Sequence, residues 1–194
     1  MSMLLQPNKQ GDKLSDLEFK NFFALMIAAG NDTTRYSMAS SIHAIANNPY
    51  IFNCLKSAPD DSPVWDSATE EFIRWASPTI HFRRTATEDY KLHGKQIREG
   101  DKVVIWFTSG NYDERKFSNP FNLILERENN NHIAFGQGGP HVCLGIWLAR
   151  LEVRVAMQEL LKRVSKIEQI APEKYLRSNF IRGIKNLPVK LTSA

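Results

Sequence analysis

Cys143 lies in a segment whose glycine spacing suits a thiolate that binds a metal. It is preceded by Gly136, Gly138 and Gly139 and followed by Gly145. A metal-binding cysteine must be kept deprotonated, and inward-pointing backbone amides or the positive end of a helix stabilise the anion. The glycines let backbone amides turn toward the sulfur, and a helix is expected just after it. Because Gly145 leaves space beside the helix start, these residues favour ligation of a metal held in a flat macrocycle.

Other interpretations of Cys143 stay open on these residues alone. Most free cysteines are simply buried apolar side chains. A phosphate-binding loop would follow a parallel strand and be followed by a lysine, and neither pattern is present. Zinc would gain only His141 and Cys143 as ligands, with no second pair nearby. Haem ligation is the interpretation that the segment favours most.

Two more segments carry polar side chains at helical positions. Ala29–Thr34 puts small, acidic and β-branched residues in the middle of an apolar helical pattern, where a plain core helix would carry leucine. Glu71 and Arg74 are three residues apart and therefore share one face of a helix. Each has an ordinary explanation as well, a helix distortion for the first and a surface salt bridge for the second.

Predicted helices carry these polar residues. Ser15 and Glu18 form a capping-box pattern, which predicts a long helix that ends near Asn47-Asn48-Pro49. Ser62-Pro63 predicts the start of another helix, with the serine as cap and the proline at its first position, running through Trp75.

The rest of the chain is predicted to alternate between short strands, an irregular segment and one more helix. We expect strands at Tyr90–Leu92, Lys95–Ile97 and Lys102–Phe107, an irregular region at 111–131, a helix at 144–164, and a loop with a terminal hairpin at 170–194. The predicted fold class is mainly α with a small β component, in a single domain over residues 1–194.

Composition excludes several classes of protein. The net charge of +4 comes from 25 basic and 21 acidic residues without basic clusters, which argues against nucleic-acid binding. The longest apolar stretch, Phe22–Gly30, is well short of the roughly 20 residues of a membrane span. No secretory signal is visible, and the only cysteines are Cys54 and Cys143, so we expect a reducing, cytoplasmic location.

Four motifs, in this order along the chain, resemble those of the cytochrome P-450 superfamily. Ala29–Thr34 is similar to the oxygen-activation motif of the distal helix, and Glu71–Arg74 to the Glu-x-x-Arg signature. Arg84–Thr87 resembles the segment that contacts a haem propionate. Phe135–Gly145 resembles the cysteine-ligand loop, in a version with one extra residue before the histidine. The resemblance extends over about 14–191, nearly the whole chain.

The resemblance implies haem b, iron protoporphyrin IX, as cofactor, with the Cys143 thiolate as axial ligand to the iron. It implies that Asp32 and Thr33 steer protons within a distorted helix, and that Glu71 and Arg74 form a structural network with residues 111–127. The remaining residues implied to contact the haem are His141 and Arg84, at its propionates, and Phe135, Gly136, Gly145, Ala29 and Gly30.

The resemblance also implies a monooxygenase that inserts one oxygen atom from O2 into an apolar substrate. Phe180 and Ile181 favour a lipid-like or steroid-like molecule. The chain has no flavin or nicotinamide pattern, so a ferredoxin or a reductase would supply electrons. Arg150, Arg154 and Lys162 are candidate contacts for such an acidic partner, although a solvated helix face explains them equally well.

Members of the family are about twice as long, and the resemblance covers only the C-terminal half of their fold. If the N-terminal half is absent, Phe22, Phe23 and Met26 should be exposed. Such a chain is expected to self-associate through its long helix. Two alternatives to a working enzyme are a non-catalytic haem-binding or ligand-sensing protein and an inactive remnant.

Overall fold

A single long helix organises the molecule. The computed structural model describes residues 2–194, and its longest element is α1 (Asp16–Ala46). The Ser15 hydroxyl accepts a hydrogen bond from the Glu18 amide, and the Glu18 carboxylate accepts one from the Ser15 amide, so the predicted capping box is confirmed. The helix runs through Ala29–Thr34 without interruption.

Two shorter helices follow, and their starts differ from the prediction. α2 (Pro49–Ser57) was missed because Pro49, read as a helix stop, is instead its first residue, with the Asn48 side chain capping the Ile51 amide. α3 (Val64–Ala76) has Pro63 at its N-cap position rather than inside the helix, and no side chain caps it. The predicted helix itself is confirmed.

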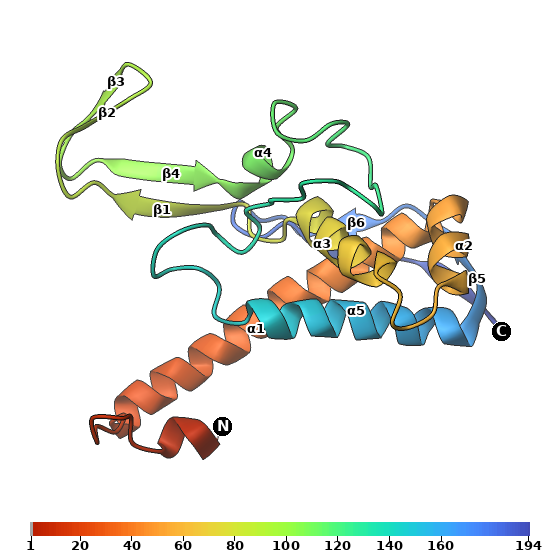
Figure 1. The fold of residues 1–194 in the computed structure, drawn as a ribbon, viewed down its shortest axis with the longest axis horizontal. Coiled ribbons are helices and arrows are strands. Elements are labelled where there is room, and N and C mark those ends of the chain that lie inside the picture. The colour runs from red at the N-terminus through yellow and green to blue at the C-terminus, as the bar shows by residue number, and fades with distance from the viewer. Residues whose placement is uncertain (1) are drawn as a thin grey trace.

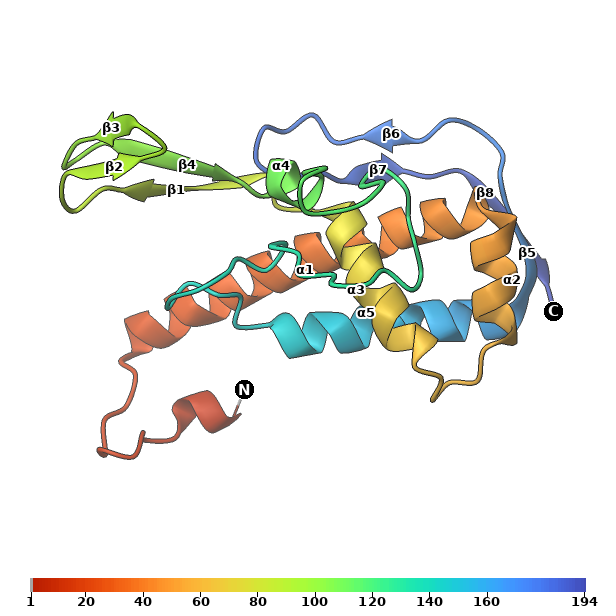
Figure 2. The ribbon, with the colours of Figure 1, turned by 45° about the horizontal axis from the view of Figure 1, so that its top comes forward.

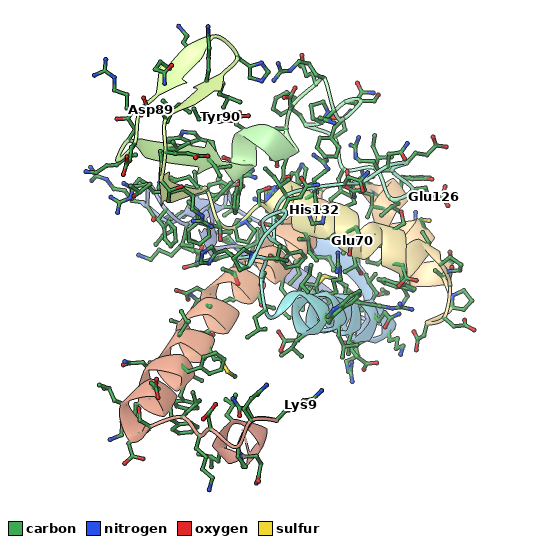
Figure 3. All side chains as sticks on the ribbon, turned by 60° about the vertical axis from the view of Figure 1, so that its left-hand side comes forward. Lys9, Glu70, Asp89, Tyr90, Glu126 and His132 are labelled. Carbon is green, nitrogen blue, oxygen red and sulfur yellow. The ribbon has the colours of Figure 1, made fainter. Side chains whose placement is uncertain are left out.

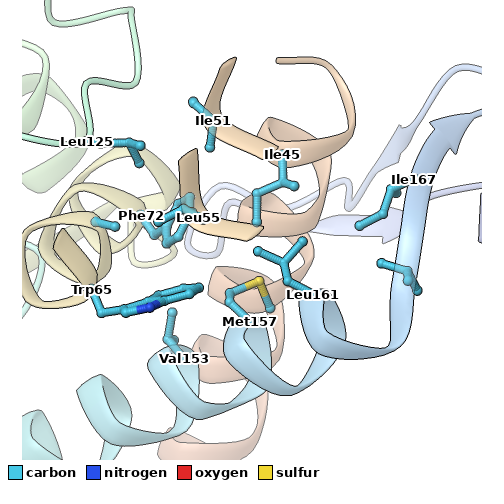
Figure 4. Packing of buried hydrophobic residues seen from close by; sticks show 12 residues of the cluster. Ile45, Ile51, Leu55, Trp65, Phe72, Leu125, Val153, Met157, Leu161 and Ile167 are labelled. Carbon is cyan, nitrogen blue, oxygen red and sulfur yellow. The ribbon is translucent and has the colours of Figure 1, made fainter. Parts of the chain in front are cut away.

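The hydrophobic core lies where α1, α2, α3 and α5 (Ile146–Arg163) meet β5 (Val164–Gln169) (Figure 4). Burial of each large aliphatic side chain contributes on the order of 2 kcal/mol, so this cluster fixes the helices relative to one another. Its largest members are Ile45, Ile51, Leu55, Trp65, Phe72, Val153, Met157 and Leu161.

Short antiparallel ladders make up the β component of residues 2–194. The predicted strands β2 (Tyr90–Leu92) and β3 (Lys95–Ile97) are confirmed, joined by His93-Gly94 with φ of 45° and 77°. The other pairs are β1 (His81–Thr85) with β4 (Lys102–Trp106), β5 with β8 (Val189–Ser193), and β6 (Lys174–Tyr175) with β7 (Ile184–Asn186). The fold is mainly α with a small β component, as predicted.

The C-terminal region is paired differently from a simple terminal hairpin. β8 returns to β5, which continues directly from α5, so the end of the chain is joined to the helical core. The remaining helices are α4 (Phe107–Asn111) and a 3-10 turn at Ser2–Leu5. No helix of residues 2–194 is long and apolar enough to cross a membrane.

Two arms extend from the helical core in the same direction. One is the first half of α1, and the other is formed by β1 to β4 (Figures 1 and 2). The segment that leads into α5, teal in both views, lies on the side to which the arms extend. Phe23 and Met26 on the first arm are exposed as predicted, whereas Phe22 is half-buried.

Candidate functional site

The loop before α5 has a backbone path that glycine makes possible. Gly136, Gly138 and Gly139 have φ of 77°, 69° and 77°, in the left-handed region that other residues rarely adopt. The backbone N–H of Cys143 donates to the carbonyl oxygen of Phe135 at 2.9 Å, which closes the loop. The glycines are therefore needed to bring the two ends of this segment together.

Cys143 lies at the end of this loop, just before the N-terminus of α5, and its side chain is exposed. Gly145 is the N-cap residue of α5, and a Cβ atom there would lie 4.0 Å from Sγ of Cys143. Free backbone amides at a helix start stabilise an anion. The sulfur thus lies at a helix start, with its outer side open.

Large apolar side chains are exposed on the segments around this sulfur. Leu144 and Trp147, next to the cysteine in sequence, are 80% and 78% exposed. Further exposed apolar residues are Phe23 and Met26 on α1, Phe82 on β1, Val104 and Trp106 on β4, and Val142, Leu148 and Leu151 around the start of α5. Exposed apolar surface of this extent marks a binding site. An exposed cysteine, a loop with open space at Gly138 and Gly139, and apolar surroundings fit a haem.

The two residues predicted at the propionates are exposed and unpaired within residues 2–194. Arg84, on β1, donates only to the backbone carbonyl of Arg83, at 3.0 Å. His141, two residues before Cys143, is also exposed. Both side chains are therefore available to a carboxylate.

Asp32 and Thr33 make contacts within α1 only. The Thr33 hydroxyl donates to the carbonyl oxygen of Ala29 at 2.7 Å, and Asp32 is paired with Arg35 at 2.7 Å. Despite this bond of the hydroxyl to the carbonyl four residues earlier, α1 continues through Ala29–Thr34 as one α-helix. Gly30 has no atom within 4 Å of where a Cβ would lie, so the helix surface there is open.

Glu71 and Arg74 form a buried network on α3. Both side chains are fully buried, and two nitrogens of Arg74 donate to the two carboxylate oxygens of Glu71 at 2.7 and 2.8 Å. Arg127 donates to the same carboxylate at 2.9 and 3.0 Å. Arg127 is the last residue of the segment that the resemblance implied as partner of Glu71 and Arg74, so the predicted network is present.

This network anchors the irregular segment between α4 and the cysteine loop. Arg74 donates to the carbonyl oxygens of Asn111 and Pro120 at 2.8 and 2.9 Å. The Asn111 side chain in turn accepts from the amide of Ile133 at 2.7 Å. A chain of hydrogen bonds therefore runs from α3 to the residues just before the loop.

A second acidic residue on α3 was also missed. Glu70 accepts hydrogen bonds from Nε and Nη2 of Arg150 at 2.6 and 2.8 Å, and its carboxylate lies 3.2 Å from Nε2 of His132 (Figure 3). Burial raises the pKa of Glu70, but the hydrogen bonds from His132 and Arg150 outweigh it and lower the pKa to about 2. Glu70 is therefore held as a carboxylate.

The three cations proposed to face an electron donor are already paired. Arg150 contacts Glu70, Arg154 contacts Asp66, and Lys162 contacts Asp60. These pairs join α5 to α3 and to the segment before it. Arg150 is also in contact with an aromatic ring, since its guanidinium lies 5.3 Å from the ring centre of Phe135.

A comparison with family models agrees with this site. The model described as cytochrome P450 matches residues 1–190. A methyl-branched lipid omega-hydroxylase of Mycobacterium tuberculosis is 41% identical over 188 residues, which are 97% of this chain and 44% of that protein. A steroid C26-monooxygenase of the same species is 35% identical, over 99% of this chain and 43% of that protein. The chain thus spans less than half the length of these curated relatives.

Solved structures give the same result for the fold. The crystal structure of CYP108D1 from Novosphingobium aromaticivorans superimposes with a TM-score of 0.92 at 35% identity, covering 100% of this chain and 46% of that one. CYP109E1 from Bacillus megaterium, in complex with corticosterone, gives 0.90 at 33% identity, covering 97% of this chain and 50% of that one. Similarity at this level extends to the whole arrangement of helices and ladders.

Proposed function

Because the chain belongs to the cytochrome P450 family, we propose that it is the haem-binding part of a haem-thiolate monooxygenase. The observation that carries this proposal is the exposed sulfur of Cys143 in its glycine loop at the start of α5. The family implies haem with a cysteine thiolate ligand, and Cys143 is the cysteine that lies in the glycine loop before α5.

The residues proposed to hold the haem come from three parts of the chain. Cys143 would be the axial ligand. Arg84 and His141 would donate hydrogen bonds to the propionates, because a carboxylate accepts strong hydrogen bonds from such side chains. A haem with an anionic sulfur ligand supplies O2 activation, because the sulfur donates electron density that favours O–O cleavage. The residues that would lie against its faces are Phe135, Gly136, Gly145, Ala29 and Gly30.

Asp32 and Thr33 are proposed to move protons at the distal side. The Thr33 hydroxyl now donates its proton to the Ala29 carbonyl, so it must rotate to donate outward from the helix. Asp32 must likewise turn from Arg35, an exposed pair whose mutual attraction is worth less than about 1 kcal/mol. Both movements are therefore small changes of rotamer on an otherwise fixed helix.

An apolar, lipid-like or steroid-like substrate is proposed from the exposed apolar side chains and from the relatives. Their names include a lipid hydroxylase, a steroid monooxygenase and a linalool monooxygenase. Phe180 lies beside His81 and Phe82, with ring centres 6.0 and 5.6 Å away, and forms an aromatic surface on the β arm. Electrons would come from a separate ferredoxin or reductase.

The test is a carbon monoxide spectrum of the reduced, haem-loaded protein. A thiolate-ligated haem gives a red-shifted Soret band, and Cys143→Ala should abolish it while Cys54→Ala, the other cysteine, retains it. A product assay with a surrogate redox partner then separates a monooxygenase from a non-catalytic haem protein. A protein that takes up no haem, or a band that persists in Cys143→Ala, contradicts the proposal.

A further inference from the structure

Glu70 connects two side chains that approach it from different elements. Arg150 reaches it from α5, and His132 reaches it from the irregular segment before the cysteine loop. His132 is almost fully buried, and its Nδ1 accepts the backbone N–H of Ala134 at 3.2 Å. Because an amide only donates, Nε2 must carry the proton that His132 donates to Glu70.

Both partners of Glu70 contact the same aromatic ring. The imidazole of His132 lies 5.8 Å from the ring centre of Phe135, and the guanidinium of Arg150 lies 5.3 Å from it. Arg150 also lies 5.1 Å from the ring of Trp147, in the first turn of α5. One carboxylate thus fixes two groups that hold Phe135 in place.

Phe135 is joined directly to the cysteine. Its carbonyl oxygen accepts the backbone N–H of Cys143 at 2.9 Å, and the next amide, that of Gly136, donates to the carbonyl of Ile133. This hydrogen bond couples the position of Cys143 to that of Phe135. The glycines between them are flexible and do not hold Cys143 in place by themselves.

An ordinary ion pair between α3 and α5 would not have this effect, and the chain contains one for comparison. Asp66 lies one turn before Glu70 and pairs with Arg154, one turn after Arg150. Neither Asp66 nor Arg154 is hydrogen-bonded to the cysteine loop in residues 2–194.

From these contacts we infer that Glu70 is a positioning residue for the cysteine ligand, acting through His132 and Arg150 on Phe135. The inference depends on the proposed function only for the role of Cys143 as haem ligand. The contacts themselves exist in the chain without haem, so they can be tested first in the haem-free protein.

The first experiment measures amide hydrogen exchange in the haem-free protein. In Glu70→Ala, the amides of Cys143 and Gly136 should exchange on the order of ten-fold faster, while that of Met157, in the core of α5, changes less than about two-fold. Asp66→Ala is the matched control and should leave all three amides unchanged. Equal effects of the two variants, or unchanged protection at Cys143, overturn the inference.

Two further variants keep the test valid if Glu70→Ala does not fold. Glu70→Gln retains an acceptor oxygen and should restore part of the protection. Arg150→Lys keeps the charge but removes the planar group beside Phe135, and should speed exchange at Cys143 by a few-fold. If neither variant changes that amide relative to Asp66→Ala, the inference is wrong.

The second experiment measures the thiolate-ligated fraction in the haem-loaded protein. Glu70→Ala should lose at least about half of the red-shifted carbon monoxide band at equal haem content, and Asp66→Ala should retain it. Failure of the proposed function is distinguished by Cys143→Ala, which would then keep the band. A band that is equal in the two acidic variants contradicts the role of Glu70 alone.

Discussion

At the scale of single residues, the Glu71 carboxylate is a buried charge with several hydrogen-bond donors around it. It is fully buried and accepts hydrogen bonds from Arg74, Arg127, the amide of Ile124 and the side chain of Asn130. A buried charge is tolerated only when it is paired and hydrogen-bonded, and here two arginines depend on one acid. Loss of Glu71 would leave both cations without a counter-ion.

We therefore expect Glu71→Gln to lower the free energy of unfolding by about 3–5 kcal/mol, measured by urea denaturation. Glu152→Gln is the control, because Glu152 is exposed on α5 and should change stability by less than about 0.5 kcal/mol. A loss below about 1 kcal/mol for Glu71→Gln would mean that the network is not needed for the fold.

At the scale of elements, α3 connects the core to the cysteine loop through two adjacent acidic residues that face different partners. Glu71 accepts hydrogen bonds from Ile124 and Arg127 of the irregular segment, whereas Glu70 is bonded to His132 and Arg150, which contact Phe135. Because Glu70 has a pKa of about 2 in the folded protein, below its ordinary value of 4.5, its ionised form stabilises the fold.

This stabilisation should be present above about pH 5 and be lost as the pH falls toward 2. With allowance for partial exposure, it amounts to about 2 kcal/mol. Urea midpoints of the wild type and of Glu70→Gln, measured from pH 7 down to about pH 2.5, should converge below about pH 4. A stability difference that stays constant over this range would show that the charge of Glu70 does not contribute.

Helices and strands whose ends are marked by capping or turn residues could be predicted from the sequence. Strands whose partners are distant in sequence were harder to predict. The capping box at Ser15 and the turn at His93-Gly94 each carry their own chemistry, so α1 and the β2–β3 hairpin were predicted with nearly correct bounds. β1 and β5 were missed because their partners, β4 and β8, lie far along the chain. Within the site, the glycine loop makes Cys143 the predicted ligand, whereas Glu70 becomes a candidate only when folding brings His132 and Arg150 to it.

At the scale of the whole molecule, α1 is packed along one half only. Residues from Thr34 onward contact the core, while apolar side chains of the first half, such as Phe23, Leu25 and Met26, are exposed. Exposed apolar area on a helix favours association with a second apolar surface. Self-association through α1 therefore remains our prediction for this chain.

The double variant Phe23→Ser, Met26→Ser should lower the average mass at about 100 μM toward the monomer mass, as measured by sedimentation equilibrium. That monomer mass is 22.2 kDa. Ile170→Ser removes an apolar side chain that is 64% exposed but lies outside α1, and should leave the average mass unchanged. Three proteins of equal mass would contradict association through this helix.

The three ion pairs that join α5 to α3 and its preceding segment differ in their exposure to water. The side chains of Lys162 and Asp60 are 49% and 58% exposed, whereas those of Arg150 and Glu70 are both 27% exposed. Salt screens solvent-exposed charges far more than buried ones. Rising ionic strength should therefore weaken the pair of Lys162 with Asp60 first, and the pair of Arg150 with Glu70, at the end of α5 next to Cys143, should persist at salt concentrations that have already screened the other.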